Sequence, residues 1–170
     1  MMWVMTMEQR TRKRNRLDGY SYDQQGTYYL TICVQDRKQV LSRILPSEQG
    51  AQVKLLPHGE VADRQLREMN CLYEGIRVDH YVIMPDHIHI LLTVLKSEKN
   101  EPKNAVISKF VGTFKRFCNK TYGENIWQAR SYDHIIRDQQ DYETKWIYMD
   151  NNPIKWLMTE NNPVGSSLPD

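Results

Sequence analysis

The stretch YVIMPDHIHILLTV, residues 81–94, constrains the fold of this chain more than any other segment. It is an apolar run that a Pro-Asp turn interrupts and that resumes with two histidines separated by one hydrophobic residue. Successive side chains of a strand point to opposite faces, so His87 and His89 share one face while Ile88 points into the core. Two imidazoles about 7 Å apart on one strand face can converge on one cation. Two exposed polar residues at the start of a strand would give the same spacing, so the pattern alone leaves both interpretations open.

Length and composition are those of an ordinary globular protein. With 170 residues, of which 40% are hydrophobic and 26% charged, we expect one domain over residues 1–170. The net charge of +2 excludes a polycation, so any affinity for nucleic acid must come from local basic surface. Three widely spaced cysteines favour a reducing compartment. No run approaches the roughly 20 apolar residues that span a bilayer, and we therefore expect a cytoplasmic protein with no membrane partner.

Two groups of basic residues are candidates for contacts with DNA phosphates. The first is an arm at residues 1–16, which carries Arg10, Arg12, Lys13, Arg14 and Arg16. Such an arm binds nucleic acid by releasing counterions, although a solvated, flexible tail has the same composition. The second group is Lys109, Arg116 and Lys120, which line up on one side of a predicted helix and are weaker evidence, because helices commonly carry solvated lysines. The polar residues 161–170 are predicted to form a flexible tail.

Hydrophobic periodicity predicts an alternation of strands and helices. In chain order these are a strand at 28–35, a hairpin within 39–56, a helix at 59–72, strands at 76–84 and from His87 onward, a helix at 106–122, a strand at 132–137 and a helix at 138–151. Pro153 predicts that this last helix ends before a short second one. In the strand at 76–84 we expect Val78, His80, Val82 and Met84 on one face. Without the hairpin the order is β-α-β-β-α-β, an α+β ferredoxin-like sandwich with an antiparallel sheet and helices on one face.

The helix after Asp138 separates its packing residues from its polar ones. Tyr142, Trp146 and Met149 form an apolar stripe, whereas Tyr148 lies about 120° around the helix from it. Asn152 follows Tyr148 one turn later, on the same face. A phenol followed by an amide suits a nucleophile beside a metal ligand. A half-buried amphipathic tyrosine and an asparagine that caps the next helix would give the same pattern.

Four blocks together resemble a known family. They are RLDGYSYDQQGTYYLTICVQDR, YVIMPDHIHILL, IWQARSYDHIIRD and YMDNNPIKW, within residues 12–156. His87-Ile88-His89 resembles the HUH motif, in which U is hydrophobic, of single-tyrosine transposases that act on single-stranded DNA. The whole set is similar to the branch of these transposases associated with repetitive extragenic palindromes in bacteria.

This resemblance implies a ferredoxin-like domain with a C-terminal catalytic helix and divalent-metal-dependent nicking through a covalent 5′-phosphotyrosine. The metal, Mg²⁺ or Mn²⁺, would be held by His87, His89 and Asn152, and Tyr148 would be the nucleophile. Two residues depart from the family pattern: Asp86 stands where Asn is common, and Asn152 is shorter than the Gln of better-known members. Tyr142 lies six residues before Tyr148, unlike the closely spaced pair of two-tyrosine enzymes, which favours a single nucleophile.

The implied partner is single-stranded DNA with hairpin or palindromic elements, bound by a monomer or a homodimer. The aromatic residues Trp127 and Tyr132 are candidates for stacking on bases. One alternative is a relative that binds DNA hairpins but no longer cuts them. Another is a histidine phosphoesterase, a class that generally needs two separated histidine motifs, whereas this chain has one, with His134 as a lone further candidate.

Overall fold

The computed structural model describes residues 25–95 and 105–160, so the predicted basic arm (Arg10–Arg16) and C-terminal tail lie outside the described residues. The elements in chain order are β1 (Gly26–Cys33), the short 3₁₀ helix η1 (Gln35–Arg37), β2 (Ser42–Ser47), β3 (Gly50–Leu55), α1 (Pro57–Leu72), β4 (Ile76–Ile83), β5 (His87–Val94), α2 (Ala105–Tyr122), β6 (Tyr132–Ile135) and α3 (Gln139–Glu160). In this part of the chain, no helix is long and apolar enough to cross a membrane.

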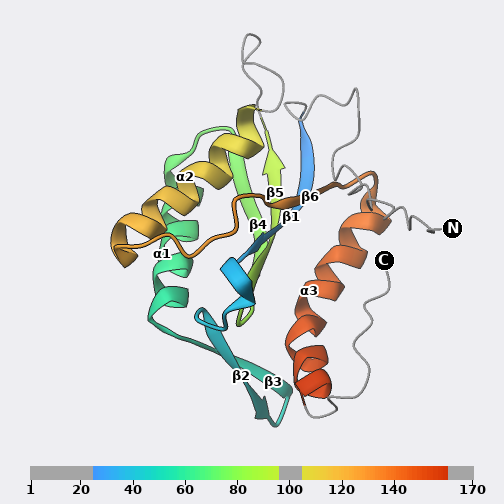
Figure 1. Ribbon diagram of the computed structural model, residues 1–170. Coiled ribbons are helices and arrows are strands. Elements are labelled where there is room, and N and C mark those ends of the chain that lie inside the picture. Colours follow the sequence, from blue (N-terminus) through green and yellow to red (C-terminus); the bar gives the residue numbers. More distant parts are fainter. Residues whose placement is uncertain (1–24, 96–104, 161–170) are drawn as a thin grey trace, which may run out of the picture.

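Four strands form an antiparallel sheet in the order β4-β5-β1-β6, and β2 pairs with β3 in a separate hairpin. This order confirms the predicted α+β ferredoxin-like fold with an extra hairpin. Helices α1 and α2 cover one face of the sheet, whereas α3 lies on the opposite side (Figure 1). The central pair β1 and β5 is in register such that Thr31 faces His89 and Cys33 faces His87. The histidine strand is therefore in the middle of the sheet.

The face under α1 and α2 is the main hydrophobic core. Alternate residues of β1 and β5 point into it, as the strand period predicts; these are Tyr28, Leu30, Ile32, Ile88, Ile90, Leu92 and Val94. Trp127 belongs to the same core, because its ring is 1% exposed and its centroid lies 5.5 Å from that of Phe114. The prediction that Trp127 stacks on DNA bases is therefore wrong, since presenting the indole to DNA would open the core.

The opposite face of the sheet holds a smaller cluster under α3. Tyr29, Leu91 and Met149 are buried at its centre. Val82, Ile136, Tyr142 and Trp146 pack around them. The predicted stripe of the last helix is thus its docking stripe, and it leaves the neighbouring face of α3 free for other contacts.

The strand β4 departs from the predicted alternation at Asp79. A bulge between Val78 and His80 shifts the register with β5, so Val78 joins the main core while His80 reaches α3. An extra residue in one strand reverses the phase of every side chain after it. The expectation that Val78, His80 and Val82 share a face is therefore wrong.

Helix α3 also continues where the sequence predicts a break. Pro153 lies inside an uninterrupted helix, and Asn152 is consequently an interior residue rather than an N-cap. A proline in a helix interior costs about 3 kcal/mol. Asn152 and Pro153 are both buried, and the last turns of α3 pack on β2 and β3, where Ile154 lies against Gly50. Packing on the hairpin offsets the cost of the proline. Because this contact joins segments far apart in the chain, the residue preferences within α3 do not predict it.

Candidate metal and nucleophile site

Two histidines of β5 and the tyrosine of α3 meet on the face of the sheet that α3 covers. The Nε2 atoms of His87 and His89 are 3.0 Å apart, and both side chains are buried. The ring of Tyr148 lies edge-on to that of His89, with 5.7 Å between centroids. The structure thus brings the predicted nucleophile next to the predicted pair of metal ligands.

The carboxylate of Asp86 hydrogen-bonds to the Nδ1 atom of His87. This Nδ1 lies 2.5 Å from Oδ1 of Asp86, and Oδ2 of the same carboxylate accepts from Nε of Arg37 at 3.0 Å. The carboxylate accepts the proton on Nδ1, which fixes the orientation of the ring with Nε2 turned toward His89. Asp86 therefore orients the imidazole of His87 and is itself anchored by Arg37.

Arg37 reaches Asp86 from an unusual backbone conformation. Asp36 and Arg37 both have positive φ, 54° and 55°. The left-handed region is unfavourable for residues other than glycine and is concentrated at functional sites. This turn also brings Nη1 of Arg37 within 3.0 Å of Sγ of Cys33. About half of the Arg37 side chain remains exposed, so a positive charge stands at the edge of the site.

His89 is held by two hydroxyl groups from β1. Its Nδ1 lies 2.7 Å from the phenol oxygen of Tyr29 and 2.9 Å from Oγ1 of Thr31. Burial, together with the charges of His87, Arg37 and Lys145, lowers the pKa of His89 to about 2. The imidazole is therefore neutral, as a metal ligand must be. When its proton is on Nδ1, a hydroxyl oxygen accepts it and Nε2 is free to bind.

The residues present fit a divalent cation. At metal–nitrogen distances of about 2.1 Å and a right angle between ligands, two nitrogens lie about 3 Å apart, which is the spacing of the two Nε2 atoms. Within residues 25–95 and 105–160, no three His, Cys, Asp or Glu side chains are close enough to hold a metal. A third protein ligand from these residues would therefore be of another type. Asn152 is buried one turn after Tyr148, and its Nδ2 has no hydrogen-bond partner in the described structure.

Tyr148 combines exposure with a basic neighbourhood. Its side chain is 41% exposed although it lies beside buried His89, so the phenol is open to a large substrate. Nζ of Lys155 lies 5.0 Å from the centre of its ring. Nζ of Lys145 lies 5.1 Å from the ring of Tyr29, whose centroid is 6.4 Å from that of Tyr148. One ammonium group thus lies over the ring of Tyr148 and a second over the neighbouring ring of Tyr29, and both could attract a phosphate.

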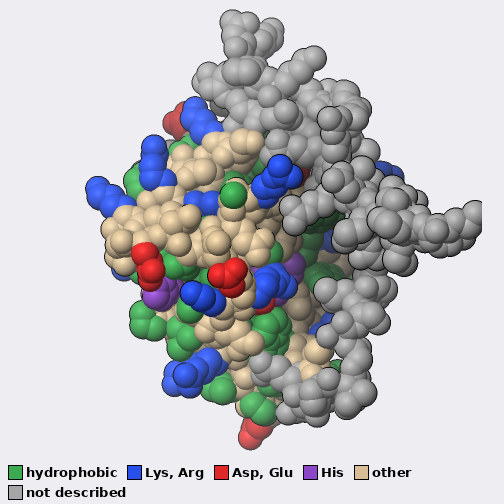
Figure 2. Space-filling view, in the orientation of Figure 1, with side chains coloured by type: hydrophobic (Ala, Val, Ile, Leu, Met, Phe, Trp, Pro, Cys, Tyr) green, Lys and Arg blue, Asp and Glu red, His purple; other side chains and the backbone are tan. Residues whose placement is uncertain are grey.

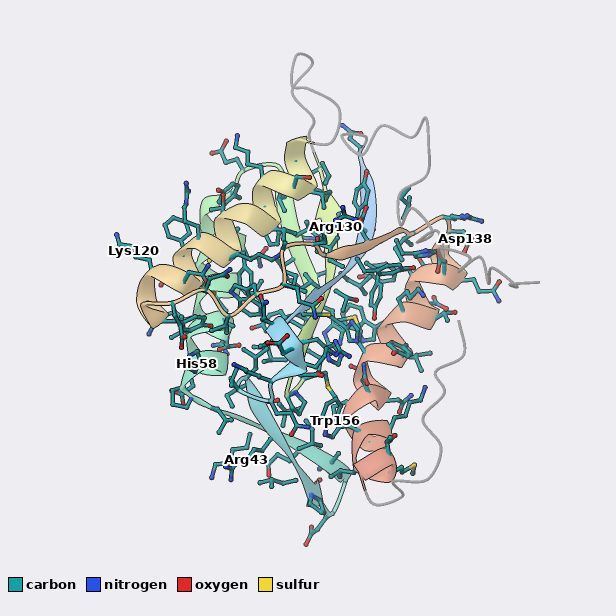
Figure 3. The ribbon with its side chains drawn as sticks, in the orientation of Figure 1. Arg43, His58, Lys120, Arg130, Asp138 and Trp156 are labelled. Carbon is teal, nitrogen blue, oxygen red and sulfur yellow. The ribbon has the colours of Figure 1, made fainter. Side chains whose placement is uncertain are left out.

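The other predicted DNA-binding residues do not join this site. Lys109, Arg116 and Lys120 are exposed on α2, on the other side of the sheet, where Lys and Arg side chains are spread over the surface (Figure 2). Figure 3 labels Lys120 at the outer end of α2 and Trp156 beside α3. Tyr132 is 44% exposed at the start of β6 and remains available for stacking. A DNA role for these residues stays a prediction.

The sequence reasoning missed Tyr29 and Thr31, which hold His89, and four further residues near the site: Arg37, Lys145, Lys155 and Trp156. For the three on α3 a signal was present, because positions three before and seven or eight after Tyr148 share its helix face. For Arg37 there was none, since its place depends on the left-handed turn and on the pairing of β1 with β5.

Known proteins resemble the chain in sequence and in fold. A REP-associated tyrosine transposase of Escherichia coli strain K12 is 25% identical over 133 residues, which are 78% of this chain and 69% of that protein. An uncharacterized protein of Haemophilus influenzae strain Rd is 27% identical over 163 residues, covering 84% of this chain and 88% of the relative. No known protein-family profile matches the chain.

A solved structure shares the fold. It is a REP-associated tyrosine transposase bound to a REP hairpin, with a TM-score of 0.56 and 22% sequence identity. The match covers 77% of this chain and 68% of that one. The similarity in fold agrees with the relationship that the sequences indicate.

Proposed function

This chain is a relative of the REP-associated tyrosine transposases, and on this premise we propose that it is a metal-dependent endonuclease and strand transferase of single-stranded DNA. The observation that supports this activity best is the contact of Tyr148 with His89, because it joins a partly exposed phenol to a pair of buried imidazoles. The two Nε2 atoms lie 3.0 Å apart beside this phenol, an arrangement that suits a shared cation.

In the proposed reaction, the Tyr148 oxygen attacks the phosphorus of a phosphodiester. A phosphorus–oxygen bond to tyrosine forms as the bond to the 3′-oxygen breaks, and the tyrosine carries the 5′-phosphate. The phenol proton is lost and the departing 3′-oxygen gains a proton, so the products are a 5′-phosphotyrosine and a free 3′-hydroxyl. The number of phosphoester bonds is unchanged, and strand transfer by a new 3′-hydroxyl therefore needs no nucleotide cofactor.

The residues of the chain divide this work between them. His87, His89 and Asn152 would hold Mg²⁺ or Mn²⁺, which supplies Lewis-acid stabilisation of the charge that develops on the phosphate. Lys145 and Lys155 would attract the phosphates on either side of Tyr148. Arg37 would anchor Asp86 and add positive charge at the rim. Burial of the imidazoles excludes water from the ligand side of the site.

The proposed substrate is a DNA hairpin with single-stranded flanks. It is suggested by the structural neighbour, which is bound to a REP hairpin, and by the exposure of Tyr148. A DNA substrate of this kind agrees with the predicted cytoplasmic location. Use of the arm at residues 10–16 and of the α2 lysines for more distant contacts stays a prediction, as does the choice between monomer and homodimer.

A denaturing gel tests the nucleophile. The protein is incubated with end-labelled hairpin DNA and Mn²⁺, and we expect a slowly migrating protein–DNA adduct that disappears in Tyr148→Phe. Tyr142→Phe is the matched control, because it makes the same change two turns earlier on the same helix and should keep the adduct. An adduct of equal strength in Tyr148→Phe would contradict the proposal. Hairpin binding without any adduct in the unmodified protein would instead identify a non-cleaving DNA-binding protein.

The metal ligands require a separate test. We expect His87→Ala to lose cleavage while hairpin binding, measured by electrophoretic mobility shift, is retained, since phosphate contacts dominate affinity. Addition of EDTA to the unmodified protein should reproduce this result, and excess Mn²⁺ should reverse it. Full cleavage by His87→Ala in the presence of EDTA would contradict a metal role for this residue.

A further inference from the structure

Trp156 lies at the edge of the site without belonging to either core. Its ring centroid is 6.3 Å from that of His87, with the two planes inclined at 44°. The side chain is half-buried, and it packs against neither of the two hydrophobic clusters that the described residues form. Figure 3 shows Trp156 on the side of α3 that faces the strands. A large aromatic ring thus lies beside His87, a proposed metal ligand, and belongs to neither hydrophobic cluster of the described residues.

Trp146, a second tryptophan of the same helix, differs from Trp156 because it packs in a hydrophobic cluster. The indole of Trp146 stacks on His80 at 4.2 Å, almost parallel, and belongs to the cluster that docks α3 on the sheet. Trp146 therefore has a structural role that accounts for its size. Trp156, almost three turns later, has the same size without such a role.

The position of Trp156 on the helix connects it to the chemistry. Tyr148, Asn152 and Trp156 follow each other at intervals of four residues, so they form one stripe along α3. The rings of His87 and His89 on β5 connect the two ends of this stripe. The centroid distances along the row are 6.3 Å from Trp156 to His87, 4.5 Å from His87 to His89 and 5.7 Å from His89 to Tyr148. A phosphate held between the histidines and Tyr148 would therefore have its neighbouring nucleotide on the side of Trp156.

We propose that Trp156 is a base-stacking residue, which binds the base of one of the two nucleotides joined by the scissile phosphate. The inference rests on the proposed function and extends it to the recognition of unpaired DNA. Aromatic side chains are the usual platforms for single-stranded bases, because every base has a π-face. Stacking is available only to an unpaired base, so Trp156 would favour single-stranded over paired DNA at the cleavage position.

Fluorescence of 2-aminopurine tests this contact without cleavage. In the Tyr148→Phe background, the probe is a REP-type hairpin with 2-aminopurine placed at each position of its single-stranded flank in turn. We expect binding to quench the fluorescence strongly at one position, and Trp156→Leu to abolish that quenching. Trp156→Phe should retain much of it, because a smaller ring still stacks. Phe117→Leu is the matched control, since it removes an exposed ring from α2, on the other side of the sheet, and should change nothing.

Cleavage kinetics give a second readout. We expect Trp156→Leu to lower kcat/KM by roughly 5- to 150-fold, the range of a single base–aromatic stack. An abasic site at the quenched position should lower the rate of the unmodified protein similarly and should cost Trp156→Leu little more, because both changes remove the same contact.

Two outcomes would overturn the stacking role: unchanged quenching in Trp156→Leu, or fully additive effects of the variant and the abasic site. Absence of hairpin binding by the Tyr148→Phe protein would overturn the proposed function itself. The two failures are therefore distinguishable in one set of measurements.

Discussion

The two faces of the central sheet differ although they are built from the same two strands. On β1 and β5, one set of alternate side chains is apolar and enters the main core, whereas the other set includes Thr31, His87 and His89. Among the described residues, two helices cover the first face and α3 covers the second (Figure 1). A period of two residues therefore lets one strand pair supply stability on one side and chemistry on the other.

The way α3 is attached reflects this division. Its apolar contacts come from the small cluster around Met149 and from the packing of its last turns on β2 and β3, and two polar contacts secure its sides. His80 lies 2.8 Å from Asp150, and His134 lies 2.9 Å from Asp141, near the start of the helix. The helix that carries Tyr148 is thus docked by a small apolar cluster, by the hairpin and by two polar contacts, whereas α1 and α2 cover the main hydrophobic core. Changes on the two faces should consequently separate stability from activity.

The largest effect is expected in the main core. Phe114 is fully buried against Trp127, and Phe114→Ala should lower the free energy of unfolding by about 3–5 kcal/mol through lost burial and a cavity. Urea denaturation measures this. Ile90→Val is the milder companion, with about 0.5–1.5 kcal/mol expected. Cleavage per folded molecule should be unchanged in both, and a loss of specific activity without a loss of stability would contradict the division between the faces.

An intermediate effect is expected from Asp86, which hydrogen-bonds to His87. Asp86→Asn weakens the acceptor that orients His87, and should reduce Mn²⁺ affinity by about 10- to 100-fold, the usual cost of losing such a partner. Isothermal titration calorimetry measures this affinity. Asp63→Asn is the control, because Asp63 pairs with Arg67 and Tyr81 away from the histidines. Equal metal affinities in the two variants would show that Asp86 does not support the site.

The smallest expected effect is a pH dependence of the free energy of unfolding, caused by His89 on the face of the sheet that α3 covers. Burial lowers the pKa of His89 to about 2, so below the ordinary histidine value of about 6.5 the unfolded chain binds a proton that the folded chain excludes. Stability is therefore full above pH 6.5 and decreases as the pH falls toward 2. Between pH 6.5 and 5.5 the loss from this group is about 1 kcal/mol.

Urea denaturation in EDTA, with His89→Asn as the reference, isolates this contribution. The variant should lose less stability than the unmodified protein over the same pH interval, because asparagine does not titrate. Identical pH dependence in the two proteins would contradict a buried, neutral His89.

Local patterns in the sequence predicted the fold and the members of the site to different degrees. The alternation of β1 and β5 predicted which residues enter the core, and the helical angle predicted that Tyr148 lies off the docking stripe of α3. Both are properties of a single element. The buried position of Trp127, by contrast, depends on how α2 and the following loop close over the sheet.

Other features depend on contacts between segments far apart in the chain. The continuation of α3 through Pro153 depends on packing against the β2–β3 hairpin. The ion pair of Arg37 with Asp86 depends on a turn in which Asp36 and Arg37 both adopt the left-handed conformation, which is uncommon for residues other than glycine. Contacts of this kind have no period in the sequence, and so residue patterns do not predict them.

The central claim is that Tyr148 becomes covalently joined to DNA, and peptide mapping of the adduct tests it most directly. Trypsin cleaves after Lys145 and Lys155, so Tyr148 is the only tyrosine of the peptide WIYMDNNPIK, whereas Tyr142 lies in the preceding peptide DQQDYETK. After nuclease digestion of the DNA, mass spectrometry should find the nucleotide-phosphate mass on WIYMDNNPIK. The same mass on DQQDYETK, or on a peptide from the sheet, would contradict the account.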